Sequence, residues 1–177
     1  PDGLYCAYHE GTDYKSVEAT YVNNVKHGLE NRYSFKRNQK YAEINWKSGT
    51  KHGIETHYNG DETIWYLLTF SEGVLNGQFI INWNRGAKRY NGYYKNGFRD
   101  SIWTYYDHEN SRTDSANYWI SKRYRYTDGK GFLISAWNKQ GEQVIINGEG
   151  TFTDRDFRTT TEYKRGMKNG KQVALGL

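Results

Sequence analysis

Two of the five histidines, two carboxylate pairs and the single cysteine are the residues of this 177-residue chain whose types and spacing could do chemistry. His27 and His52 hold the same position in two consecutive copies of a repeated octapeptide, as a metal-binding pair would. Equivalent positions in successive hairpins lie two strands apart, roughly 9.6 Å. Two imidazoles on one zinc would each lie about 2 Å from it. We therefore expect these histidines to be turn residues, and we expect no metal site.

The carboxylate pairs are Asp107 with Glu109 and Asp154 with Asp156, spaced so that both side chains share one face of a strand. Such a pair could act as acid and base on a glycoside. Both pairs lie in or near expected turns, so we interpret them as solvated turn residues. The one cysteine, Cys6, excludes an intrachain disulfide and a multi-cysteine metal site.

Motifs for nucleophilic catalysis and for phosphate binding are missing from the sequence. No Gly-x-Ser-x-Gly segment is present. The recurring Gly-x-x-x-Gly spacing lies between expected strands, and no helix follows it whose N-terminus could hold a phosphate. We therefore expect a protein that is not an enzyme and that uses no cofactor.

The strongest pattern is an octapeptide of the form aromatic-x-x-Gly-x-x-x-Gly that recurs along the chain. Copies begin at Tyr21, Trp46, Phe70, Tyr94 and Tyr163, and the first four start 25, 24 and 24 residues apart. A fixed period of this size is the signature of a repeat architecture. Short strand-like segments separate the copies, so each period predicts one β-hairpin plus its link to the next.

The glycines of the octapeptide are expected to form turns that need positive φ. They are Gly28, Gly49, Gly53, Gly73, Gly77, Gly97, Gly166 and Gly170. Asn24 and Ser101 stand where other copies have glycine. Asn tolerates the left-handed region, so the turn at Asn24 should survive, whereas serine at 101 is a weaker choice.

The predicted fold is all-β: an elongated, twisted antiparallel array of about seven β-hairpin repeats in a single-layer meander. We expect one domain over residues 1–177, with regular repeats in 1–118, a degenerate unit in 119–147 and a terminal repeat in 148–177. Mean hydropathy is −1.02, yet aromatic residues make up 17 % of the chain. The core is therefore expected to be built from Tyr, Trp and Phe.

The octapeptides resemble variant MORN repeats, and the chain is similar to the bacterial proteins grouped as YwqK-family antitoxins. The resemblance rests on the octapeptide followed five residues later by an aromatic, as in residues 28–33 and 53–58, and on the phrase Asn147-Gly-Glu-Gly-Thr-Phe152. It covers residues 3–118 and 141–170. It implies β-hairpin repeats of the MORN-variant type, an exported or envelope location, and functions such as scaffolding, dimer formation or lipid binding. No catalytic residue follows from it.

A second set of aromatics is expected to form a binding face, because one face of a single-layer sheet lacks a covering layer. Trp and Tyr dominate protein recognition, and the same rings suit stacking on sugars. The set comprises Trp65, Phe79, Trp83, Tyr93, Trp103 and Tyr105. If these rings are exposed, Trp83→Ala and Trp103→Ala weaken partner binding with little loss of melting temperature. The alternative is that they form the second packed surface of the sheet.

The formal net charge is +5, and basic residues are scattered among acidic ones. The densest basic patch comprises Lys122, Arg123, Arg125 and Lys130. We interpret it as solvated turns and strands, with contact to anionic lipid as the alternative. Nucleic acid is not expected as a partner, because it would require a stronger stripe of one sign.

The sequence thus predicts a non-catalytic scaffold or binding protein whose partner is another protein, in a bacterial envelope or exported setting. One alternative is an antitoxin or immunity protein for a single toxin. The other is peripheral binding to anionic lipid or to a glycan. We see no signal peptide at the start of the sequence, and we expect that an export signal preceded Pro1.

Overall fold

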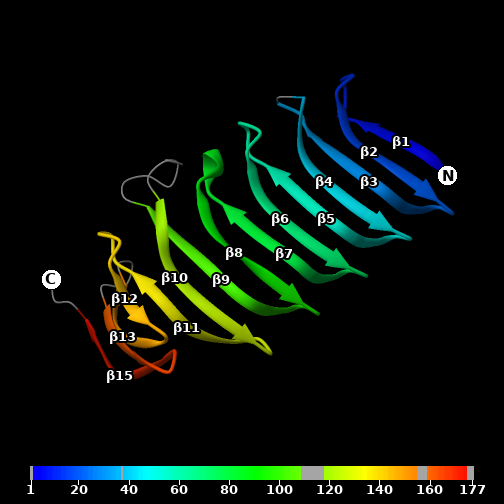
Figure 1. Cartoon of the computed structure of the whole chain (residues 1–177). Helices are drawn as coiled ribbons and strands as arrows, with labels where there is room; N and C mark the ends of the chain where they lie inside the picture. The colour runs from blue at the N-terminus through cyan, green and yellow to red at the C-terminus, as the bar shows by residue number, and fades with distance from the viewer. Residues whose placement is uncertain (1, 37, 109–117, 155–158, 175–177) are drawn as a thin grey trace.

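The computed structural model describes residues 2–36, 38–108, 118–154 and 159–174. They form one antiparallel sheet of fifteen strands, in which each strand pairs with its neighbours along the chain (Figure 1). This confirms the all-β array of hairpins. The elements are β1 (Gly3–Tyr8), β2 (Lys15–Val22), β3 (Val25–Ser34), β4 (Gln39–Lys47), β5 (Thr50–Tyr58), β6 (Ile64–Ser71), β7 (Val74–Asn82), the short 3₁₀ turn η1 (Asn84–Gly86), β8 (Lys88–Lys95), β9 (Phe98–His108), β10 (Tyr118–Thr127), β11 (Lys130–Trp137), β12 (Gln143–Ile146), β13 (Glu149–Asp154), β14 (Thr159–Lys164) and β15 (Met167–Ala174).

Two-residue turns line one long edge of the sheet, which we call the turn edge; longer loops line the other, the loop edge. Both residues of each turn have positive φ, the type I′ geometry whose twist matches that of the strands. The turns are Asn23–Asn24, Ser48–Gly49, Glu72–Gly73, Asn96–Gly97, Asp128–Gly129, Asn147–Gly148 and Arg165–Gly166. Asn24 keeps its turn, as expected, with φ of 62°. The turn at Asp128–Gly129 shows that the segment expected to be degenerate still forms a hairpin.

The second glycine of the octapeptide lies inside a strand rather than in a turn, which corrects the prediction for these residues. At the first of them, residues 27–29 lie opposite the single residue Thr20. Such a bulge requires a residue with positive φ, a conformation in which glycine is unstrained. The glycines at this position are Gly28, Gly53 and Gly77, with φ of 84°, 88° and 128°. Gly170 likewise lies within a strand, β15.

Ser101 holds the same bulge position in the fourth copy, with φ of 59°. The left-handed region costs a residue with a Cβ roughly 1 kcal/mol. We therefore expect Ser101→Gly to raise the free energy of unfolding by about 0.5–1 kcal/mol in urea denaturation. Ser101→Ala is the matched control, because it keeps the strain and removes only the hydrogen bond from Ser101 Oγ to Asp100 (2.8 Å). Equal stability of the two variants would contradict the strain argument.

Backbone hydrogen bonds join each of several turns to the hairpin before it. Because the bonded groups are backbone atoms, this connection does not depend on side-chain identity. It fixes the spacing of successive repeats along the turn edge. The donors are the N–H groups of Gly49, Gly73 and Gly97, and the acceptors are the carbonyl oxygens of Lys26, Lys51 and Leu75, at 2.8–2.9 Å.

The two faces of the sheet carry different side chains, because residues alternate between faces along each strand. Face A is the one on which Ala19, Glu30, Ile44 and Glu55 lie directly opposite one another across β2 to β5, with Trp103 further along the array. All five are buried. Face B is the opposite face. The core of this thin protein therefore lies on face A.

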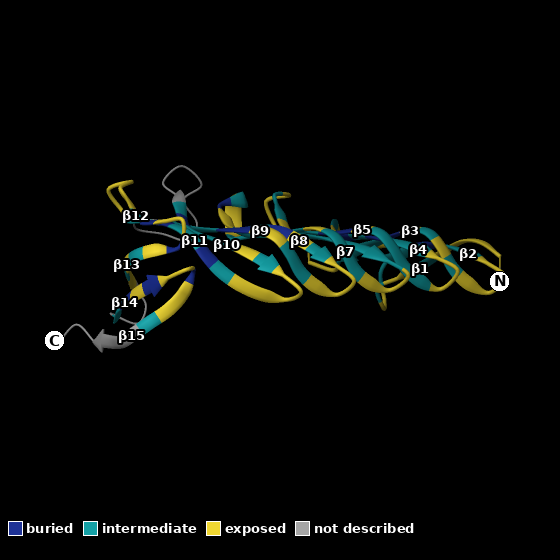
Figure 2. Cartoon of the chain, turned by 60° about the horizontal axis from the view of Figure 1, so that its bottom comes forward, coloured by how far each residue is buried: buried dark blue, intermediate teal, exposed yellow. Residues whose placement is uncertain are grey.

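The C-terminal strands turn out of the layer that β1 to β9 form (Figure 2). Leu133, Ile145 and Tyr163, from β11, β12 and β14, are buried together with Ala136. The N–H of Leu133 donates to the carbonyl oxygen of Gly166 at 2.9 Å, so the last turn lies against β11. The sheet thus curls at this end, where the prediction was a single layer throughout. Within the described part of the chain, no helix is long and apolar enough to cross a bilayer.

Candidate binding surfaces

The histidines of the octapeptide help to hold the turn edge together. Nδ1 of His27 accepts a long hydrogen bond from the N–H of Ser48, and Nδ1 of His52 accepts one from the N–H of Glu72, both at 3.5 Å. Asn76 does the same for the following turn, at 3.4 Å. In these three copies a side-chain acceptor, His or Asn, thus faces the N–H of the next turn. Among the residues that the structure describes, no group of three or more His, Cys, Asp or Glu could hold a metal ion.

The carboxylate pairs singled out in the sequence fall largely outside the described residues. Glu109 and Asp156 lie there, and so does the side chain of Asp154. Asp107 lies in β9. The interpretation of these pairs as solvated turn residues therefore stays a prediction.

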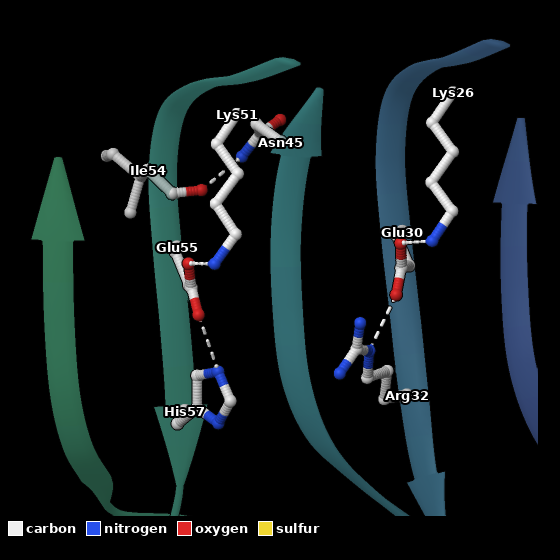
Figure 3. A network of polar contacts seen from close by, with 8 residues as sticks. All are labelled: Lys26, Glu30, Arg32, Asn45, Lys51, Ile54, Glu55 and His57. Carbon is white, nitrogen blue, oxygen red and sulfur yellow. Dashed lines mark hydrogen bonds and ion pairs between the residues drawn. The ribbon is translucent and has the colours of Figure 1, made fainter. Parts of the chain in front are cut away.

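Sequence reasoning missed a buried carboxylate on face A, Glu30, whose exposed fraction is 0 %. Its Oε2 accepts a hydrogen bond from Lys26 Nζ, and its Oε1 accepts one from Arg32 Nε, both at 2.6 Å (Figure 3). All three residues lie on β3. Both carboxylate oxygens are thus engaged by cations.

The next repeat carries an equivalent network on β5, 25 residues further along the chain. Glu55 accepts from Lys51 Nζ at 2.5 Å and from His57 Nε2 at 2.9 Å (Figure 3). The imidazole of His57 also stacks on the ring of Tyr66, with centroids 4.1 Å apart. The signal in the sequence is Lys-x-x-x-Glu-x-Arg/His at one fixed place in two repeats.

Burial and ion pairing act in opposite directions on these groups. Burial alone would raise the pKa of Glu30, but the hydrogen bonds from Lys26 and Arg32 outweigh it and hold the pKa below its usual value. Burial lowers the pKa of His57, and the hydrogen bond to Glu55 offsets only part of this. At neutral pH, Glu30 is therefore ionised and His57 is neutral.

A structural role fits these networks better than a catalytic one. Phe79 and Trp103 hold the positions equivalent to Glu30 and Glu55 in the next two repeats. The same slot is thus filled by a paired carboxylate in two repeats and by an aromatic ring in two others. The networks fill the core of the first repeats as the rings fill the later ones.

Trp103 is fully buried, so the prediction that it belongs to an exposed binding face is wrong. Its ring lies on Gly92, where an added Cβ would come within 2.4 Å of it. Its indole N–H donates to the carbonyl oxygen of Tyr93 at 3.0 Å, and the guanidinium of Arg99 lies 4.2 Å from its ring centroid. Other rings surround it at centroid distances of 5.3–6.2 Å: Phe79, Tyr90, Tyr94 and Tyr126.

The remaining residues of the expected binding face do not share a surface. Phe79 and Tyr105 are half-buried parts of the same aromatic cluster on face A. Trp83 is half-buried at the loop edge, with the guanidinium of Arg89 4.0 Å from its ring. Trp65 is exposed at the loop edge, and Tyr93 is exposed on face B.

The expected basic patch is likewise divided between the faces. Lys122 lies on face A, with its ammonium 4.6 Å from the ring of Phe152. Arg123 and Arg125 lie on face B, and Lys130 follows a tight turn. Because neighbouring residues of a strand point to opposite faces, this run of basic residues forms no single patch.

An apolar stripe on face B was not singled out in the sequence. Leu29, Ile54 and Ile102 each follow the residue at the bulge position, and Leu4 follows Gly3, whose φ of 105° is also positive. In the order Leu4, Leu29, Ile54 and Ile102, these side chains are 68, 42, 47 and 45 % exposed. Tyr93, on β8, lies in the same row. We call these five residues the face-B stripe. Its signal in the sequence is an aliphatic residue directly after the last residue of the octapeptide, as at Leu29, Ile54 and Ile102.

A groove of about 570 Å³ lies at the loop edge, among the loops that follow β1, β3 and β5. Aromatic and amide side chains form much of its lining. Sequence reasoning did not find it, because its residues come from three loops and the adjoining strand ends, which only the sheet brings together. The lining includes Tyr33, Phe35, Gln39, Tyr41, Tyr58 and Asn59.

The architecture defines the chain as a β-hairpin repeat protein. Comparison with known proteins finds no family model and no curated protein that matches the sequence. The assignment to variant MORN repeats therefore stays a prediction, which rests on the sequence motifs described above.

Proposed function

We propose that this protein is a non-catalytic scaffold that binds another protein through the face-B stripe. The observation that carries the proposal is the repeated exposure of a large aliphatic side chain, more than 40 % in each of four equivalent positions. Large apolar side chains that a repeat exposes on one face mark a candidate interaction site. Here the repeat places them in a row, because equivalent positions lie roughly 9.6 Å apart.

The neighbours of the stripe support a protein as partner. Aliphatic and polar side chains alternate along the row, and a mixture of apolar and polar contacts is typical of a protein–protein interface. The residues directly opposite the four aliphatic side chains in the register are Thr20, Asn45, Thr69 and Arg125. The sheet that carries them is fixed by strand pairing and by the backbone bonds of the turn edge, so little conformational entropy is lost on binding.

The proposal includes membership of the MORN-variant repeat proteins and a bacterial envelope or exported setting. The recurring octapeptide and the hairpin array support the membership. The setting follows only from the resemblance in sequence.

The third repeat supplies a substitution that the fold already accepts, because Gln78 stands where other repeats have the aliphatic residue. We expect the double variant Ile54→Gln/Ile102→Gln to lose the partner while its melting temperature changes little. The test is affinity capture from extracts of the source organism at physiological salt, followed by mass spectrometry. Val74→Gln is the matched control, since Val74 is 47 % exposed at the turn edge, away from the stripe.

Capture of a protein by the wild type and the control, with about a tenfold loss for the double variant, would support the proposal. Recovery of one protein in near-equal amount would favour the antitoxin or immunity form of this function. If no captured protein depends on the stripe, the proposal fails. Binding to anionic liposomes that fades with rising salt would then favour a lipid as partner.

A further inference from the structure

The repeats differ in what they place at two linked positions of face A. In the first two copies of the octapeptide, Lys26 and Lys51 stand at the sixth position, and each pairs with the glutamate four residues later. The third copy has apolar residues at both positions. The fourth copy keeps a cation, Arg99, but Trp103 stands where the glutamate would be. Arg99 thus keeps the charge of this position without the carboxylate that pairs with it in the first two repeats.

Arg99 has no carboxylate partner among the residues that the structure describes. The strands on either side, β8 and β10, contain no Asp or Glu. The next residue in the chain, Asp100, lies on face B, opposite Tyr93. Strands β8, β9 and β10 together carry seven Lys and Arg residues and only two Asp. This surplus of positive charge attracts anions to the middle of the sheet.

The guanidinium of Arg99 has hydrogen-bond donors to spare. Its Nη1 donates to the hydroxyl of Tyr105 at 2.8 Å and to that of Tyr126 at 3.1 Å. Nη1 carries two of the five guanidinium protons, and the hydroxyl of Tyr94, which also bonds to the group, accepts one more. At least two N–H groups therefore remain for a ligand. We call these four residues of face A the Arg99 cluster.

The phenols of the Arg99 cluster are donors as well. Burial raises the pKa of Tyr105 well above its usual value, so this hydroxyl stays protonated at neutral pH. A hydroxyl that accepts a bond from Arg99 still has its own proton to donate. Tyr105 and Tyr126 also bond to each other, which uses one of their two protons and leaves the other for a ligand. A ligand that complements these donors must supply acceptor oxygens and a negative charge.

A carboxylate matches this cluster better than a phosphate monoester does. Arg99 brings one positive charge into a group of aromatic rings, so the second charge of a phosphate would lose water without gaining a partner. The planar guanidinium also fits the two oxygens of a carboxylate. The rings of Trp103 and Tyr126, with centroids 4.2 and 5.5 Å from the guanidinium carbon, hold the arginine in place. Little side-chain entropy is therefore lost on binding.

We propose that the Arg99 cluster binds a side-chain carboxylate of an acidic peptide segment, which lies on face A. This carboxylate takes the role that the buried glutamates have in the first two repeats. The surplus of cations on β8 to β10 attracts the other carboxylates of the same segment. The site lies on the face opposite the face-B stripe, so it is separate from the protein-binding surface proposed above.

The test is isothermal titration calorimetry of the full chain with a hexaglutamate peptide, with hexaglutamine as the uncharged comparison and with inorganic phosphate. We expect hexaglutamate to bind and hexaglutamine not to bind. Arg99→Gln should weaken hexaglutamate about ten- to a hundredfold, as expected for loss of charge-assisted hydrogen bonds. Arg125→Gln is the matched control, because it removes the same charge from face B of β10. It should weaken binding by less than about threefold, since its charge acts only through screened solvent.

Two further variants separate ligand binding from an effect on folding. Tyr126→Phe keeps the ring and removes the hydroxyl, so the melting temperature should change little while hexaglutamate binds about three- to tenfold more weakly. Arg99→Lys keeps the charge but not the planar fork, and its affinity should lie between those of the wild type and Arg99→Gln. If Arg99→Gln does not fold, Tyr126→Phe decides the question, and an unchanged affinity would overturn the proposal.

The proposal also fails if hexaglutamate does not bind, if phosphate binds more tightly than hexaglutamate, or if Arg99→Gln and Arg125→Gln weaken binding equally. The last result would mean that only the net charge of the protein attracts the peptide. The double variant Ile54→Gln/Ile102→Gln should bind hexaglutamate as the wild type does. The outcome on face A is therefore independent of whether the face-B stripe has a partner.

Discussion

Trp103→Ala is expected to lower the free energy of unfolding by about 3–5 kcal/mol, the usual cost of removing a fully buried tryptophan. The ring is 0 % exposed and is the largest fully buried side chain in the described part of the chain. Its loss would open a cavity over Gly92, which has no side chain to fill it. The carbonyl oxygen of Tyr93 would lose its indole donor, and Arg99 would lose the ring on which it lies.

Urea denaturation followed by intrinsic fluorescence and circular dichroism measures this effect. Trp65→Ala is the matched control, because that indole is 49 % exposed and its removal should cost less than about 1 kcal/mol. Similar losses for the two variants would mean that face A is not the core. The result also decides how binding data for face-A variants are interpreted. If Trp103→Ala binds a partner more weakly, the cause would be unfolding rather than the loss of a direct contact.

Glu30→Gln is expected to lower the free energy of unfolding by about 2–3 kcal/mol at pH 7. This is less than the largest losses seen when a buried ion pair is broken. The cost is smaller because Lys26 and Arg32, which would lose their partner, are 28 and 37 % exposed and can regain water. Glutamine keeps the shape of the side chain, so the variant isolates the charge. Chemical denaturation at several pH values measures it.

The pH dependence of this difference has a definite sign. The pKa of Glu30 is lower in the fold than in the unfolded chain, so its contribution is present above the ordinary carboxyl pKa and is lost as the pH falls through the folded value. The difference in free energy of unfolding between wild type and Glu30→Gln should therefore become smaller below about pH 4. His57 acts in the same direction at higher pH, because its pKa is also lowered and its protonation opposes folding.

An exposed ion pair provides the control for this argument. Glu72 pairs with Lys47 at 3.0 Å, but its side chain is 64 % exposed. Solvent screens such a pair, so Glu72→Gln should change stability little. If the difference in free energy of unfolding between wild type and Glu30→Gln stays the same from pH 7 to pH 3, the carboxylate charge is not what stabilises the first repeats.

The period of the octapeptide was enough to predict the hairpins, because a spacing of 24 or 25 residues fits two strands and two connections. It did not separate the roles of its two glycines. Positive φ serves both a type I′ turn at Gly49 and a bulge at Gly53, and the sequence shows only that glycine stands at both. The bulges became visible with the register, which depends on pairing between distant residues.

Burial of particular rings depends on the same register. Trp103 lies flat because Gly92, on the neighbouring strand, leaves space for it, and that contact is not apparent from the position of either residue in the octapeptide. The middle unit, residues 119–147, was expected to be degenerate because the octapeptide is lost there. Tyr126-Thr-Asp-Gly129 nevertheless begins a normal hairpin there. The groove could not be predicted from the sequence, because it is lined by loops and strand ends that lie far apart in the chain.

The difference between the two edges of the sheet bears on how this chain can be altered. At the turn edge every described connection has two residues, and backbone bonds link turn to turn, so an insertion there would disrupt the attachment of the next repeat. At the loop edge the connections 9–14, 35–38 and 59–63 differ in length without disturbing the strands. New peptide segments should therefore be grafted at the loop edge, where the molecule can display variable sequences on a scaffold of constant pitch.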